Sequence, residues 1–249
     1  PSAKALMPCT TSGTANPGCV DLYRDSNSVA KTRVHHLTVS NSIEPGTSGQ
    51  WGIYIEGYEL QSANIGWQVD HVTCTTSTAA TTTRSGCLRI IVGDKVDLYN
   101  NDFTCAADTD ACQGMEIIPS AGSENGLVHN NKITLNTSVT SGTSRGIVVS
   151  GPDSGTVGAE GWQIYSNYIV ANNNRAIRLR QTRYANVHDN QIVACACVTS
   201  GCYHLGDPSN GTDYVSDAHT DIYNETVAMT GGTAFWARDG YGWKIYNSI

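Results

Sequence analysis

One position of a short repeated phrase carries most of the side chains that could do chemistry. The phrase has four residues, with apolar side chains at its second and fourth places, as in Gly-Met-Glu-Ile at 114–117 and Ala-Ile-Arg-Leu at 176–179. Because side chains alternate along a strand, we expect the third place to point away from the core. The residues at this place are Tyr54, Arg89, Glu116, Val148, Arg178, His204 and Phe235.

Stacking of these strands would form a column that could cleave a uronic-acid polymer by β-elimination. That reaction needs a cation to neutralise the carboxylate, a base for the C5 proton and an acid for the leaving oxygen. Arg178 or Arg180 could supply the cation, His204 could act as the base, and Arg89 or a tyrosine could assist. Epimerisation at C5 would use the same groups. The predicted catalytic residues are Arg178, His204, Arg180, Glu116 and Arg89.

The same column has a structural interpretation. Charged side chains on neighbouring strands often form pairs across an exposed sheet face. Two places further along, Glu56, Ser150 and Arg180 would join that face. The sequence leaves both interpretations open.

A second phrase carries an aromatic residue and, two places later, an asparagine. It reads WQIYSNYIV at 162–170 and ANVHDNQIV at 185–193. Degenerate copies lie around Val34 and Val69, and the spacing between copies varies from 23 to 36 residues. A fixed motif with variable spacing indicates a solenoid with loops of different length. Its other apolar anchors are Leu98, Val128, Ile164, Val187, Ile222 and Ile245.

The asparagines of this phrase are expected to be structural. Asparagine tolerates the left-handed conformation of a sharp turn, and its amide can bond to the backbone or to the next asparagine in a stack. The residues concerned are Asn101, Asn131, Asn167 and Asn190, and Glu225 takes the same place in a later copy.

The aromatic place predicts an outward column with two possible uses. Stacked rings stabilise a solenoid by themselves. The same column would also be a strip on which sugar rings or another protein could lie. With Tyr54 from the first phrase, the predicted substrate-binding residues are Tyr54, Tyr99, His129, Tyr165, His188 and Tyr223; Tyr246 continues the column.

With these repeats, residues 33–249 resemble the right-handed parallel β-helix of the pectate-lyase-like superfamily, with about seven coils. The resemblance implies an all-β fold of three strands per coil. It implies little about function, since that superfamily includes lyases, hydrolases, epimerases, tailspikes and adhesins. The chain lacks the clustered aspartates of polygalacturonase-like hydrolases. A calcium-dependent lyase would have acidic ligands on the first-strand face, where only Glu56 and Glu116 stand, so we expect no cofactor.

The two ends of the chain differ from the repeat. Residues 1–32 lack it, and we predict that they cap the coil stack, whose strand edges would otherwise be unpaired. Residues 243–249 form half a coil. We expect further chain or another subunit to cover that end.

The nine cysteines predict disulfides at equivalent loops. Cys9 and Cys19, Cys74 and Cys87, and Cys105 and Cys112 form short local pairs, and disulfides indicate an oxidising, extracellular compartment. At the next equivalent loop the partner of Cys202 is either Cys195 or Cys197. The sequence leaves this choice open, and the predicted set of cysteines takes Cys197. Metal binding by this trio with His204 is the alternative, but its spacing matches no zinc pattern. The predicted disulfide cysteines are Cys9, Cys19, Cys74, Cys87, Cys105, Cys112, Cys197 and Cys202.

Charge and composition narrow the class of function. A net charge of −7 argues against a nucleic-acid partner, and no apolar run is long enough for a membrane span. We therefore expect a secreted, carbohydrate-associated β-helix whose partner is a polysaccharide or cell-surface glycan. It would be a lyase or C5-epimerase if it is an enzyme. The alternative is a non-catalytic adhesin, or a structural subunit of an extracellular assembly.

Overall fold

The computed structural model consists of strands and turns. It describes residues 5–11, 18–23, 32–43, 49–57, 66–78, 85–91, 95–107, 112–119, 125–135, 144–151, 159–196, 201–206, 219–238 and 242–249. These residues contain no α-helix, so none of them forms a helix that could span a membrane.

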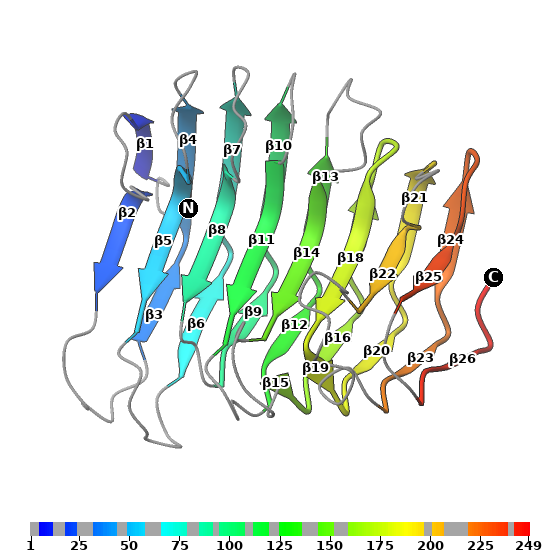
Figure 1. The fold of residues 1–249 in the computed structure, drawn as a ribbon. Helices are drawn as coiled ribbons and strands as arrows, with labels where there is room; N and C mark the ends of the chain where they lie inside the picture. The colour runs from blue at the N-terminus through cyan, green and yellow to red at the C-terminus, as the bar shows by residue number, and fades with distance from the viewer. Residues whose placement is uncertain are drawn as a thin grey trace.

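Most of the described strands lie in three eight-stranded parallel sheets (Figure 1). Sheet A contains β1 (Ala5–Thr11), β4 (Leu37–Ile43), β7 (Thr73–Thr78), β10 (Asp102–Ala107), β13 (Lys132–Leu135), β17 (Tyr168–Val170), β21 (Gln191–Cys195) and β24 (Thr226–Met229). Sheet B contains β2 (Gly18–Tyr23), β5 (Trp51–Glu56), β8 (Ser85–Ile91), β11 (Cys112–Ile118), β14 (Arg145–Ser150), β18 (Arg175–Arg180), β22 (Tyr203–Leu205) and β25 (Phe235–Ala237). Sheet C contains β3 (Thr32–His35), β6 (Trp67–Asp70), β9 (Asp97–Tyr99), β12 (Leu127–His129), β16 (Gln163–Tyr165), β20 (Asn186–His188), β23 (Asp221–Tyr223) and β26 (Lys244–Tyr246).

Each coil of the chain adds one strand to each sheet. The first phrase forms the strands of sheet B, and the second phrase forms sheet C and, after a turn, sheet A. Successive strands follow one another along each sheet from blue to red in Figure 1. A separate two-stranded sheet pairs β15 (Ala159–Glu160) with β19 (Thr182–Arg183). This all-β, all-parallel arrangement is compatible with the expected parallel β-helix.

The N-terminal region takes part in two of the sheets. β1 pairs in parallel with β4, and β2 pairs in parallel with β5. Residues 5–11 and 18–23 therefore extend sheets A and B, and the capping role of residues 1–32 stays a prediction. At the other end, β26 is the last strand of sheet C and pairs with β23.

The core is made by the apolar places of both phrases. In sheet B both places point inward and are fully buried from β5 to β22, and the anchor of the second phrase is buried in each coil from β6 to β23. Full burial of one such side chain stabilises a fold by about 1.5–3 kcal/mol. The sheet B residues are Ile53, Ile55, Leu88, Ile90, Met115, Ile117, Ile147, Val149, Ile177, Leu179, Tyr203 and Leu205.

A ladder of buried asparagine amides runs along the turn between sheets C and A. The Nδ2 of Asn101 donates to Oδ1 of Asn131 over 2.9 Å, and Nδ2 of Asn131 donates to Oδ1 of Asn167 over 3.0 Å. Asn167 bonds in the same way to Asn190, which donates to Oε1 of Glu225. Each Nδ2 also donates to a main-chain carbonyl. The predicted structural role of these asparagines is confirmed.

The left-handed residue of this turn is not the ladder asparagine, as the sequence suggested, but the residue before it. Asn100 and Asn130 have φ of 55° and 54°. The chain turns at this residue, which places the next side chain inside the coil, where the ladder lies. The other left-handed residues of this turn are His36, His71, Ser166, Asp189, Asn224 and Asn247.

Disulfides join strands of sheet A to sheet B. The described residues hold Cys74–Cys87, Cys105–Cys112 and Cys195–Cys202. The first two pairs are as predicted. The assignment of Cys197 is wrong, because Cys195 ends β21 with its side chain buried against the start of β22.

The structure describes the remaining predicted cysteines only in part. Cys19 is disulfide-bonded. The side chain of Cys9 and all of Cys197 lie outside the described residues.

Candidate functional site

The predicted column of reactive side chains forms on the outer face of sheet B. Neighbouring strands place Arg89 beside Glu116 and Arg178 beside His204. At the last strand the sequence-based register is wrong, because Trp236 rather than Phe235 lies beside His204. Phe235 is instead the register partner of Tyr203, and its ring stacks on the buried ring of Tyr203 with centroids 4.8 Å apart.

Most side chains of this column are buried. Glu116 has no exposed surface, Tyr54 is 3% exposed, and Arg178 and His204 are each 5% exposed. An open sheet face would leave such long side chains accessible, so the outer face of sheet B is covered around them. Burial of this kind raises the strength of every charge interaction in the column.

Glu116 is part of an ion pair. Its Oε2 lies 3.1 Å from Nε of Arg89, and the guanidinium of Arg89 also lies over the ring of Trp51 at 5.5 Å. One strand earlier, the hydroxyl of Tyr54 donates to Oε2 of Glu56 over 2.9 Å. The contacts of Arg89 join neighbouring strands, whereas the bond from Tyr54 to Glu56 lies within β5. Pairs of this kind are expected on a face with a structural role.

The other end of the column holds two arginines and a histidine. Arg178 and His204 are neighbours in register, and the ring of His204 packs against Trp236 with centroids 4.6 Å apart. Arg180 lies two residues beyond Arg178, beside Ser150. Among the predicted catalytic residues, the structure therefore brings together Arg178, Arg180 and His204 at one end and Arg89 and Glu116 at the other.

The aromatic residues of the second phrase form a continuous stack on the outer face of sheet C. Neighbouring rings have centroids 4.8 to 5.3 Å apart and planes within 10° of parallel. The predicted stacking is confirmed for Tyr99, His129, Tyr165, His188, Tyr223 and Tyr246. Tyr54 is not on this face, because it points outward from sheet B.

Stacking decides what this column can offer to a ligand. Each inner ring has its faces covered by its two neighbours, so only ring edges reach solvent. Sugar rings therefore have no ring face to lie on along the column. The edges instead present hydroxyl groups of tyrosine and nitrogens of histidine, which can form hydrogen bonds.

Neighbouring polar groups hold the histidine rings in place. Nδ2 of Asn130 lies 3.0 Å from Nδ1 of His129, and Oδ1 of Asp97 lies 3.3 Å from Nε2 of the same ring. Oδ2 of Asp189 lies 2.7 Å from Nδ1 of His188, and this hydrogen bond lowers the pKa of Asp189. The edges are thus fixed by contacts within the chain.

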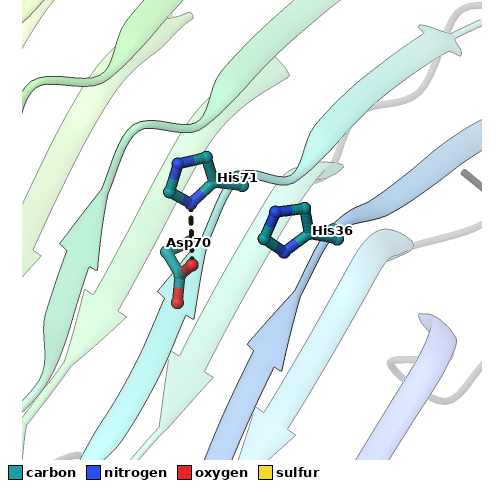
Figure 2. Close-up of side chains that lie close together, drawn as sticks. All are labelled: His36, Asp70 and His71. Carbon is teal, nitrogen blue, oxygen red and sulfur yellow. Dashed lines mark hydrogen bonds and ion pairs between the residues drawn. The ribbon is translucent and has the colours of Figure 1, made fainter. Parts of the chain in front are cut away.

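A third cluster was missed by the sequence analysis and lies at the first coils. His36, Asp70 and His71 come close together at the ends of β3 and β6 (Figure 2). Arg33 donates two hydrogen bonds to the buried carboxylate of Asp70, over 2.7 and 2.8 Å, and these hold the pKa of Asp70 well below its usual range. The signal was present, since RVHHLT and WQVDHVT place histidines at the same point of adjacent copies.

A scan of protein-family models, a search of curated proteins and a search of solved structures each found no match to this chain. The function is therefore inferred from the geometry of the column on sheet B, the ring column on sheet C and the cluster of His36, Asp70 and His71.

Proposed function

We propose that the protein is an extracellular, right-handed parallel β-helix of the pectate-lyase-like kind, and that it binds a glycan along the outer face of sheet C. The observation that carries this proposal is the continuous column of ring edges, which repeats a hydrogen-bonding group at every coil. The disulfides support an oxidising compartment.

Two further columns flank the ring edges. We call the three together the ladder face. One column precedes the rings by two residues and the other follows them by one, at the exposed left-handed turn. The flanking residues are Asp97, Leu127, Gln163, Asn186, Asp221 and Lys244, and Asn100, Asn130, Ser166, Asp189, Asn224 and Asn247.

The chemistry of the ladder face suits hydroxyl-rich ligands. A sugar hydroxyl both donates and accepts hydrogen bonds, and the amides of Gln163 and Asn186 and the hydroxyl of Tyr165 can do both as well. A polymer lying along the sheet would meet a ring edge and a polar turn residue at each coil from β9 to β26. The carboxylates of Asp189 and Asp221 and the net charge of −7 favour a neutral glycan over a polyanion.

Tyrosine-to-phenylalanine variants test this proposal without disturbing the stack. The Tyr165→Phe/Tyr223→Phe double variant keeps both rings but removes two hydroxyls from the ladder face. On a panel of neutral and acidic glycans, the parent should bind a member of the panel and the double variant should bind it several-fold more weakly. The control is Tyr168→Phe, because Tyr168 lies on sheet A and outside the ladder face. Equal binding by the double variant and the parent would rule out the ladder face.

A second candidate function is cleavage or epimerisation of a uronic-acid polymer at Arg178 and His204. The specific observation in its favour is that the guanidinium of Arg178 and the imidazole of His204 lie on paired positions of neighbouring strands and are both nearly buried. There an arginine could neutralise a carboxylate, and the histidine could take the C5 proton.

Conservative substitutions test this second candidate. Arg178→Lys keeps the charge but not the planar fork, and His204→Gln removes the base. The ultraviolet absorbance of the unsaturated product should rise with the parent on pectate, alginate or a glycosaminoglycan and should fail to rise with His204→Gln. Thermal melting of each variant would show that the fold is kept. No absorbance change and no C5 proton exchange with the parent would exclude catalysis on these polymers.

A further inference from the structure

We propose that His36, Asp70 and His71 form a binding site for a divalent transition-metal ion such as Zn²⁺. The proposal is independent of glycan binding, because it rests on other residues at the first coils of the solenoid.

The geometry of the three side chains carries this inference. Their ligand atoms all lie within 4.8 Å of one another. The imidazoles of His36 and His71 are parallel, with centroids 4.9 Å apart, and Nδ1 of His71 lies 2.8 Å from Oδ1 of Asp70. Figure 2 shows the two rings side by side, with the carboxylate next to His71.

The fold explains why two histidines meet here. His36 and His71 both occupy the left-handed turn position that follows a strand of sheet C, with φ of 52° and 53°. Equivalent turn positions of adjacent coils lie one above the other, as β3 and β6 are paired in register. Asp70 stands at the place that an aromatic ring fills in the following coils, so the ring column gives way to a carboxylate at this coil.

Two imidazoles and one carboxylate are a ligand set that suits zinc and its neighbours. Such metals bind histidine nitrogen and carboxylate oxygen at about 2.0–2.2 Å, and three protein ligands leave a fourth position for water. In a tetrahedral site the ligand atoms are therefore roughly 3.3 Å apart. His36 is exposed and the side chain of His71 is 44% exposed, so both rings can rotate to close the remaining distance.

The carboxylate is already fixed by its surroundings. Asp70 is fully buried, and it accepts hydrogen bonds from Nε and Nη2 of Arg33 and from Nε2 of Gln68. Partners of this kind orient metal ligands and are part of a working site. His35 adds a contact on the other side, with its Nδ1 2.9 Å from Nδ1 of His36.

Arg33 also determines which metals the site would take. Its positive charge offsets that of Asp70, so the site offers a cation little net negative charge. Ca²⁺ and Mg²⁺ bind through several charged or carbonyl oxygens, and the cluster does not provide them. Metals that favour imidazole, such as Zn²⁺, Cu²⁺ and Ni²⁺, should bind, and Ca²⁺ should not.

Titration of the full, oxidised chain with Zn²⁺ tests the site. Alkylation without reduction removes any contribution from a free thiol. The variants are His36→Phe and His71→Phe, which keep a ring in the stacked pair but remove the ligand nitrogens. The control is His219→Phe, because His219 also stacks on a neighbouring ring, that of Tyr184, but lies outside the cluster.

The expected result is one Zn²⁺ per parent chain, with affinity reduced by at least ~10-fold in each cluster variant and unchanged in the control. Zn²⁺ should also raise the melting temperature of the parent and not that of His71→Phe, because a ligand of the folded state stabilises it. A parent that binds no Zn²⁺, variants that bind it as tightly as the parent, or equal binding of Ca²⁺ would each overturn the proposal.

Discussion

Glu225 ends the amide ladder and differs in chemistry from the four asparagines before it. It is 1% exposed, its Oε1 accepts from Nδ2 of Asn190 over 3.0 Å, and its Oε2 accepts from the hydroxyl of Tyr203. Burial raises the pKa of Glu225 to about 7, although the bonds from Tyr203 and Asn190 oppose this shift. Burial and the nearby carboxylate also raise the pKa of Tyr203.

Glu225 should therefore make the free energy of unfolding fall as the pH rises from about 4.5 to about 7. In this range the folded chain holds a proton on Glu225 that the unfolded chain has lost, so deprotonation favours unfolding. The size of the effect is on the order of 3 kcal/mol. Glu225→Gln keeps an acceptor for Asn190 and has no proton to lose. Urea unfolding at several pH values should show a flatter profile for this variant.

Asp102→Asn is the matched control for this experiment. It also removes one carboxylate, but from β10, where Asp102 pairs with Nζ of Lys132 over 3.1 Å and takes no part in the shift at Glu225. Its slope between pH 4.5 and 7 should match that of the parent. If Glu225→Gln also kept the parent slope, Glu225 would not be the group whose titration changes the stability in this range.

At the scale of the element, two adjacent asparagines in the turn between sheets C and A have different structural roles. Asn130 is exposed and adopts φ of 54°, whereas Asn131 is 1% exposed and bonds to the coils on both sides. Both residues are asparagines, so amino-acid type does not predict which one is exposed and which one is buried. Their position within the second phrase does predict it.

Asn131→Ala should lower the free energy of unfolding by at least about 3 kcal/mol. It removes the buried acceptor of two Asn101 N–H groups and the buried donor to the carbonyl of Leu98 and to Oδ1 of Asn167. Asn130→Gly should change it by less than about 0.5 kcal/mol, since glycine adopts the left-handed conformation freely. Chemical denaturation followed by circular dichroism would measure both. Similar losses in the two variants would mean that the ladder bonds do not stabilise the turn.

The strands were predictable because their signal is local. Alternation and the fixed position of Asn101 and its equivalents predict which side chains point inward, and from that the neighbours Arg178 and His204. The register of β25 was not predictable, because it depends on contact between Phe235 and the buried ring of Tyr203, residues from different coils. The burial of Glu116 was missed for a similar reason, since alternation predicts direction and not what covers a face.

The cluster at His36 and Asp70 shows a further limit of pattern-based prediction. The first two copies of the phrase are degenerate. They have His35 and Asp70 at the place of the ring, His36 and His71 at the turn, and Leu37 and Val72 at the place of the ladder asparagine. A method that scores copies by similarity gives these the least weight. Their histidines and aspartate are far apart in the sequence, and they come together only because β3 and β6 pair in register.

At the scale of the whole molecule, the disulfides link sheet A to sheet B. In the described residues Cys74–Cys87 joins β7 to β8, Cys105–Cys112 joins β10 to β11, and Cys195–Cys202 joins β21 to the start of β22. Each connects a sheet A strand to the sheet B strand that follows it in the chain. They therefore cross-link two of the three sheets.

Reduction of these disulfides should destabilise the entire fold. The cross-links span 13, 7 and 7 residues of chain, and loops of such length stabilise a protein by about 2–3 kcal/mol each through loss of freedom in the unfolded chain. Together this approaches the total stability of many domains, about 5–15 kcal/mol. Thermal melting after full reduction, verified by thiol counting, should show a large fall in melting temperature. The Cys105→Ala/Cys112→Ala variant should show a partial fall. An unchanged melting temperature in the reduced protein would show that the three-sheet core is sufficient alone, and it would remove the disulfides as an argument for an oxidising compartment.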